Sequence, residues 1–285
     1  MTHTINRDIV TWTLDDEDRI HWGNVRLREI LGVQTVEELH DAFRRALSQA
    51  TFDAYAKAME FALLRYEAFS FEIELTTAQN ESMWLAAVHV PRFDENGTWT
   101  GYIVSAMDIT AQKRFNEKAW VAANYDKLTG LANRTLFEDH MNRELENMHR
   151  TELPFAVLFC DLDGFKAIND QHGDEAGDEA LREVARRWLR CIRRTDTLAR
   201  FGGDEFALLL AGIPGVDVAK GMADKMIDAL REPVLVAPDV RCQLGVSIGI
   251  ATPSDDKEAS IGPIVARADD AMYVAKKSGK NRYHC

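Results

Sequence analysis

Residues 198–210 read LARFGGDEFALLL, and this stretch decides the fold of the second half of the chain. Two apolar runs flank a pair of glycines. Consecutive glycines supply the positive φ angles that a tight turn between two antiparallel strands requires. We therefore expect a β-hairpin with Gly202 and Gly203 as its two-residue turn, followed at once by Asp204 and Glu205.

Strands and helices alternate around this hairpin. An apolar run at 155–160 and an alternating run at 244–250 predict two further strands. Apolar residues at helical spacing predict helices over 177–190 and 264–275. Helices and strands interleave around one sheet in a domain that we place at residues 126–285, and we expect the α+β fold class.

Carboxylates stand at the ends of two of these strands. Asp161 and Asp163 follow the run at 155–160, and Asp204 and Glu205 follow the glycine turn. Carboxylates at adjacent strand ends repel one another unless a positive charge lies between them, and hard oxygen ligands suit Mg²⁺. Acidic residues that only decorate a solvated turn have the same pattern, so the spacing alone leaves both interpretations open.

Several blocks of this half occur together in one order. The stretch RFGGDEF at 200–206 resembles the hallmark of the GGDEF family, the diguanylate cyclases. The other blocks are also similar to that family: DKLTGLANR at 126–134, DLDGFKAIND at 161–170, GDEAL at 177–181, SIGIA at 247–251 and AKKSGKNR at 275–282.

The resemblance implies an adenylyl-cyclase-like domain with a ferredoxin-like palm, which condenses two GTP molecules into cyclic di-GMP and releases two pyrophosphates. It implies two Mg²⁺ or Mn²⁺ ions in each active half-site. Asp161 and Asp204 would hold metal, assisted by the backbone carbonyl of Leu162. Glu205 would help to bind the second metal or would activate the 3′-hydroxyl.

The resemblance also assigns substrate contacts. Asn169 and Asp178 would bind the guanine edge, and glycines 202 and 203 would let the backbone approach the nucleotide. The phosphates would be held by Phe165, with backbone N–H groups near it, and by Lys166, Lys276 and Lys280. Taken singly, these residues have simpler interpretations: the lysines at 276 and 280 as solvated helix-end charges, Phe165 as core and Asn169 as a helix cap.

Regulation and assembly follow from the same resemblance. Arg193 and Asp196 match the family's R-x-x-D product-inhibition site in type and position. Asp174 stands where the family usually has His, and Lys280 replaces a frequent Arg. Since one domain holds one GTP, ring closure requires a homodimer.

The first part of the chain predicts a second domain. Apolar and alternating runs predict strands at 9–14, 19–22, 69–75, 83–90 and 98–107, and helical spacing predicts helices at 25–31 and 36–47. This pattern, with the closing Asp108-Ile109-Thr110, resembles a PAS sensor domain over residues 1–108. The resemblance implies an antiparallel sheet with flanking helices. Residues 109–125 lack Pro and Gly and predict a connecting signalling helix, which either lies on its own domain or pairs with a second chain.

The ligand of this sensor is unknown from the sequence. Three histidines, at 21, 40 and 89, are candidate haem ligands, although lone histidines are more often surface or satisfied core residues. The tryptophans at 12, 22, 84 and 99 either line a pocket or fill the core.

A rival function is a non-catalytic receptor that binds GTP or cyclic di-GMP and signals through a protein partner. Intact acidic residues at 161, 204 and 205 disfavour it. We expect no phosphodiesterase activity, because no second catalytic domain follows in the 285 residues.

Composition excludes further classes. The chain has 34 Lys and Arg against 46 Asp and Glu, a formal net charge of −12. Such a field repels nucleic-acid backbones, so we expect no polynucleotide partner. Neither a membrane span nor a signal peptide is evident, the opening being MTHTINRDIV, so we expect a cytoplasmic protein without membrane insertion. The cysteines lack a C-x-x-C pair, which argues against zinc and disulfide frameworks.

Overall fold

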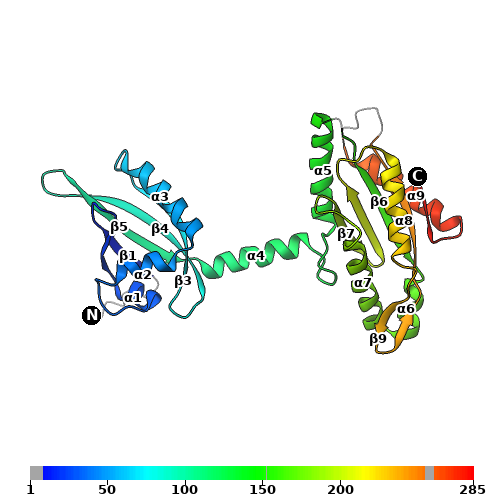
Figure 1. Ribbon diagram of the computed structural model, residues 1–285, viewed down its shortest axis with the longest axis horizontal. Helices are drawn as coiled ribbons and strands as arrows, with labels where there is room; N and C mark the ends of the chain where they lie inside the picture. The colour runs from blue at the N-terminus through cyan, green and yellow to red at the C-terminus, as the bar shows by residue number, and fades with distance from the viewer. Residues whose placement is uncertain (1–8, 152, 254–259) are drawn as a thin grey trace, which may run out of the picture. The chain divides into compact units, whose positions relative to one another are not determined.

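The computed structural model describes residues 9–151, 153–253 and 260–285 (Figure 1). Residues 1–8, which make up most of the opening segment where we expect no signal peptide, lie outside that part. Contacts divide the chain into two compact units, Met1–Lys118 and Ala119–Cys285. Within the described residues, no helix is both long enough and apolar enough to cross a membrane.

The N-terminal unit contains the predicted antiparallel sheet with flanking helices. Its sheet has the order β2-β1-β5-β4-β3, with every neighbouring pair antiparallel. The elements in chain order are β1 (Ile9–Leu14), β2 (Ile20–Gly23), α1 (Val25–Leu31), α2 (Leu39–Ala46), α3 (Gln49–Leu63), β3 (Phe69–Thr76), β4 (Ser82–Phe93) and β5 (Trp99–Asp108). Alternate residues of the strands, Trp12 and Leu85 among them, pack with helix residues such as Leu27 and Phe43 in one core.

Two helices of this unit differ from the prediction. Helix α2 begins at Leu39 rather than at 36, because the Glu38 carboxylate accepts hydrogen bonds from the N–H groups of Gln34 and Thr35 and so folds the preceding residues into a turn. Helix α3 was not predicted at all. It begins after Ser48, whose hydroxyl accepts from the N–H of Thr51 as an N-cap.

The helix predicted over 109–125 is present as α4 (Thr110–Asn124). The Asp108 carboxylate accepts from the N–H of Thr110 at its start, and the Thr110 hydroxyl accepts from the N–H of Trp84 on β4. None of the residues of α4 is buried, and the side chains of Phe115 and Trp120 are 71% and 54% exposed. The helix therefore presents Phe115 and Trp120 largely to solvent, although the Trp120 ring packs edge-on against Tyr125.

The C-terminal unit is a sheet covered by helices on both faces. Its main sheet has the order β12-β11-β6-β8-β7, antiparallel except between β11 and β12, and β9 and β10 form a separate ribbon. The elements are α5 (Arg134–Thr151), β6 (Ala156–Asp163), α6 (Phe165–His172), α7 (Asp174–Leu189), β7 (Thr197–Gly202), β8 (Glu205–Leu210), α8 (Val216–Asp228), β9 (Val234–Ala237), β10 (Val240–Cys242), β11 (Gly245–Ala251), α9 (Gly262–Lys277) and β12 (Arg282–His284).

Alternation along β6 explains the two faces. Leu158 and Cys160 belong to a core that includes residues of α7 and α8, whereas Val157 and Phe159 belong to a second core with residues of α5 and α9. Because successive side chains of a strand point to opposite faces, residue 161 continues the α5 and α9 face.

The hairpin is present, but its turn lies one residue later than predicted. Gly202 pairs with Glu205, so the two-residue loop is Gly203-Asp204 rather than Gly202-Gly203. Both glycines have positive φ, 145° and 51°. Strand β6 is also longer than predicted: pairing with β11 continues to Asp163, so Asp161 lies within the strand and not after it.

Candidate active site

The hairpin turn and the end of β6 bring three acidic residues to the same part of the sheet. Asp161 is directly opposite Glu205 in the β6–β8 register. The N–H of Leu162 donates to the main-chain carbonyl of Asp204 at 3.2 Å, which fixes the turn against the strand. Asp161 is only 8% exposed, so its charge is held in a largely buried position.

The charges of this cluster act on one another. Burial raises the pKa of the Asp161 carboxyl, Lys276 opposes that change, and Asp204 raises the pKa further. Burial also raises the pKa of Glu205, and Asp161 and Asp204 add to the effect. Negative charge therefore exceeds positive charge at this point, and a cation would relieve the excess.

Lys276 from α9 supplies a positive charge to this acidic cluster. Its Nζ lies 2.5 Å from Oδ2 of Asp161. Among the described residues, no three acidic, His or Cys side chains are gathered into a group ready to hold a metal ion. The donor chemistry nevertheless fits Mg²⁺ or Mn²⁺, since carboxylates at positions 161, 204 and 205 provide hard oxygen ligands.

The residues predicted to bind guanine lie on the helix pair α6 and α7. The Oδ1 atom of Asn169 on α6 is buried and has no hydrogen-bond partner among the described residues. It faces Gly177 of α7, where an added Cβ would lie 1.8 Å from that oxygen. Asp178 follows Gly177 and lines a cleft of about 590 Å³ beside the β9–β10 ribbon, together with His172, Glu179, Arg182 and Pro238.

The predicted phosphate ligands are only partly assembled. The side chain of Phe165 is core, as its simpler interpretation holds, and its backbone N–H lies in the first turn of α6, where N–H groups have no intrahelical partner. Lys166 and Lys280 are exposed, and Lys280 has a positive φ of 62°. A Cβ added at position 202 or 203 would meet no atom within 4 Å, so the glycine turn borders open space.

Arg193 and Asp196 share one turn just before β7. An Asp196 carboxylate oxygen accepts from the N–H of Arg193 at 2.9 Å, and the N–H of Asp196 donates back to the Arg193 carbonyl. The Arg193 side chain is exposed. Asp196 therefore has a structural task in this turn, whereas the exposed Arg193 guanidinium has no hydrogen bond or ion pair within the part of the chain that the structure describes.

The sequence did not identify the residues that hold the glycine turn. The Arg200 guanidinium donates to both carboxylate oxygens of Asp126 at 3.1 Å, and to the carbonyl of Gly203 at 3.1 and 2.9 Å. Burial alone would raise the pKa of Asp126, but hydrogen bonds from Thr129 and Arg200 lower it overall. Both residues stand in the recognised blocks, but 74 positions separate them, so spacing could not pair them.

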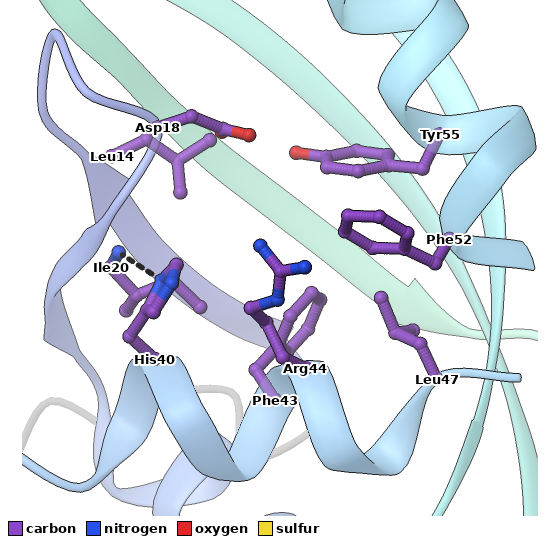
Figure 2. Close-up of a pocket in the computed structure, with 9 residues that line it drawn as sticks. All are labelled: Leu14, Asp18, Ile20, His40, Phe43, Arg44, Leu47, Phe52 and Tyr55. Carbon is purple, nitrogen blue, oxygen red and sulfur yellow. Dashed lines mark hydrogen bonds between the residues drawn. The ribbon is translucent and has the colours of Figure 1, made fainter. Parts of the chain in front are cut away.

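The N-terminal unit has a small cavity of about 30 Å³ between β1, β2, α2 and α3 (Figure 2). In Figure 2 the Arg44 guanidinium and the Tyr55 hydroxyl point toward it, and Arg44 lies 4.2 Å from the centre of the Phe52 ring. The remaining lining residues are Leu14, Asp18, Ile20, His40, Phe43 and Leu47.

The three candidate haem histidines all have protein partners. His21 contacts the hydroxyl of Thr13, His40 accepts from the N–H of Ile20, and buried His89 is hydrogen-bonded to Tyr55. Burial lowers the pKa of His89 to about 3, so it is neutral. Among the tryptophans, Trp12 is fully buried in the core, Trp22 is exposed, and those at 84 and 99 are half-buried.

Comparison with known proteins identifies the C-terminal unit. Residues 123–282 match the family model described as diguanylate cyclase, GGDEF domain. The chain is 39% identical over 174 residues to the bifunctional diguanylate cyclase/cyclic di-GMP phosphodiesterase MucR of Pseudomonas aeruginosa, covering 61% of this chain and 25% of MucR. It is 39% identical over 160 residues to the diguanylate cyclase TpbB of the same organism, covering 55% of this chain and 36% of TpbB.

Solved structures agree. The GGDEF domain of TpbB from Pseudomonas aeruginosa has a TM-score of 0.53 at 35% identity, covering 55% of this chain and 96% of that one. The coiled coil and GGDEF domain of DgcB from Caulobacter crescentus, in complex with c-di-GMP, has a TM-score of 0.56 at 26% identity, covering 62% and 92%. The chain spans well under half the length of these two curated relatives. Through residues 123–282, it belongs to the GGDEF diguanylate cyclase family.

Proposed function

We propose that the chain is an active diguanylate cyclase, which condenses two GTP molecules into cyclic di-GMP with release of two pyrophosphates. The observation that carries the proposal is the placement of Asp161, Asp204 and Glu205 at one part of the sheet, with raised pKa values at Asp161 and Glu205 and with Lys276 beside them. Carboxylates that repel one another lower the stability of the fold. Such an arrangement is typical of sites where the charge is used in catalysis.

The assigned residues divide the work of the reaction. Each 3′-oxygen forms a bond to the α-phosphorus of the other nucleotide, and the bond to the leaving pyrophosphate breaks. Two Mg²⁺ or Mn²⁺ ions, held by the three carboxylates and the Leu162 carbonyl, would neutralise the phosphates and favour ionisation of the 3′-hydroxyl. Glu205 would receive that proton or complete the metal site. Lys276 and Lys280 would hold phosphate oxygens as point charges.

The reaction requires two copies of the chain. We propose that α4 and the N-terminal unit, as a PAS-like sensor, bring the copies together and control how productively their active halves meet. The exposed apolar side chains of α4, Phe115 and Trp120, support pairing with a second chain. The cavity of the N-terminal unit, about 30 Å³, has room for a water molecule or two, so the sensory role rests on the resemblance of this unit to a PAS domain. Mass spectrometry of what the denatured protein releases would identify a ligand.

The alternative function is a receptor that binds GTP or cyclic di-GMP without turnover. Incubation of the purified chain with GTP and Mg²⁺, followed by anion-exchange chromatography, separates the two. A new bis-guanylate peak supports the cyclase. Retained GTP with no product contradicts the cyclase and supports the receptor.

Replacing Gly177 by Ala is expected to weaken selection of guanine. The new Cβ would displace the Asn169 amide, whose Oδ1 lies 1.8 Å from that position. Loss of a paired hydrogen bond to a base edge costs about 1–3 kcal/mol of discrimination, so preference for GTP over ATP should fall by roughly 5- to 150-fold. Competition binding of the two nucleotides measures this.

A matched control for that variant is Gly221→Ala on α8. Position 221 is also helical, and an added Cβ there would meet nothing within 4 Å. It should gain about 0.5–1 kcal/mol of stability from helix propensity and keep its nucleotide preference. Equal nucleotide preference in Gly177→Ala and the unmodified chain would contradict the guanine assignment.

Arg193→Ala is expected to relieve inhibition by cyclic di-GMP. The exposed guanidinium can fork onto a guanine or phosphate of the product, whereas the Asp196 carboxylate already accepts a backbone hydrogen bond in its own turn. Arg193→Ala is therefore the cleaner variant, since it leaves the turn intact. We expect the inhibition constant to rise by about tenfold or more with unchanged initial turnover. An unchanged inhibition curve would refute the assignment.

A further inference from the structure

The second carboxylate of the DLD sequence, Asp163, differs from Asp161 in what it contacts. Both lie on β6, two residues apart, so their side chains leave the same face of the sheet. Asp161 meets the Lys276 side chain. Asp163 accepts from the Ser247 hydroxyl at 3.0 Å to each carboxylate oxygen, and from the backbone N–H of Asn281 at 2.9 Å.

The segment that Asp163 contacts has an unusual backbone. Between the end of α9 and the start of β12, three successive residues have positive φ: Gly279 at 115°, Lys280 at 62° and Asn281 at 48°. L-residues with a side chain adopt this region at an energetic cost and keep it only where the surroundings enforce it. The Asn281 N–H, directly after Lys280, is the group that Asp163 binds.

We propose that Asp163 is a positioning residue, which holds the turn at 279–281 so that Lys280 is presented to the nucleotide phosphates beside the Asp161 end of β6. The inference rests on the proposed function. Strand β6 contacts the α9–β12 segment at two successive same-face positions, at Lys276 through Asp161 and at Asn281 through Asp163. A preformed turn lowers the ordering cost that a triphosphate would otherwise meet on binding.

This role and simple electrostatics predict opposite changes in nucleotide affinity when Asp163 is removed. Removing a carboxylate near a triphosphate site removes repulsion and would tighten binding. If Asp163 acts through the turn, Asp163→Ala weakens binding instead. If Asp163 were a metal ligand, the same variant would raise the Mg²⁺ concentration needed for half-maximal turnover.

The test measures binding of a GTP analogue with a methylene group between its α- and β-phosphates, which cannot be condensed. We expect Asp163→Ala to bind it about tenfold more weakly, with KM raised, kcat and Mg²⁺ requirement little changed. Asp163→Asn, which keeps one acceptor oxygen, should recover part of the affinity. Asp224→Ala, an exposed aspartate on α8, is the matched control and should match the unmodified chain.

A double-mutant cycle and hydrogen exchange complete the test. The double variant Asp163→Ala/Lys280→Ala should bind the analogue no more weakly than Lys280→Ala alone, because both substitutions act through the contact between Lys280 and the phosphates. Backbone amides in peptides covering residues 278–284 should exchange hydrogen faster in Asp163→Ala than in the unmodified chain. This result does not depend on the activity of the variant. Equal or tighter analogue binding, additive losses, unchanged exchange or a raised Mg²⁺ requirement would each overturn the role. An unmodified chain that binds no analogue would instead overturn the proposed function beneath it.

Discussion

Exchange of Glu205 for Gln is expected to lower cyclic di-GMP synthesis by on the order of 10²–10³-fold. Glutamine has nearly the same shape, but its amide is neither a base for the 3′-hydroxyl proton nor an anionic metal ligand. Glu205 is exposed, so folding should be unaffected. Partial desolvation of its carboxyl, together with the nearby Asp161 and Asp204, raises the pKa of Glu205 and makes it a better proton acceptor than an ordinary glutamate.

The control for this prediction is Glu232→Gln, an exposed glutamate of the same unit that should keep full turnover. Initial rates at saturating GTP, together with thermal unfolding of each variant, separate a lost reaction from a lost fold. A Glu205→Gln variant with undiminished turnover would remove this residue from the chemistry.

In a fragment that begins at Ala123, turnover per chain is expected to depend on protein concentration. It keeps the two cores of the C-terminal unit but lacks nearly all of α4 and the sheet domain before it. Two active halves must then meet by diffusion, so at low concentration the rate should fall by roughly 10- to 100-fold, as tethering no longer raises their effective concentration.

Specific activity over a dilution series, with the oligomeric state measured by sedimentation, checks this prediction. The full chain should keep constant activity over a range in which the fragment declines. A monomeric fragment with full turnover at every concentration would contradict the proposed role of the N-terminal half.

Local pattern predicted much of the fold. Helix α1 begins and ends at the residues that its apolar spacing predicted. The limits of β1, β3 and β5 lie within one residue of the predicted ones. Helix α3 was missed, because its signal is a cap at Ser48 and not a strong apolar stripe. The hairpin turn shifted by one residue because pairing between Gly202 and Glu205 depends on the neighbouring strand.

The sequence likewise located some residues of the candidate site and not others. Blocks of sequence located Asp161 and the hairpin carboxylates, since those residues sit beside recognisable strands. They could not show that Arg200 reaches Asp126 or that Asp163 binds a turn 118 positions away, and they left open whether Phe165 is core or a phosphate ligand. These features are contacts between distant segments, and no local spacing records them.

Phosphorus NMR of the unmodified chain with GTP and Mg²⁺ follows the substrate and both products in one sample, and therefore shows whether the chain condenses GTP. Cyclase activity predicts that the GTP signals decline while a phosphodiester signal and pyrophosphate appear, with two pyrophosphates for each cyclic di-GMP. GTP signals that persist in the presence of folded, nucleotide-bound protein would contradict it.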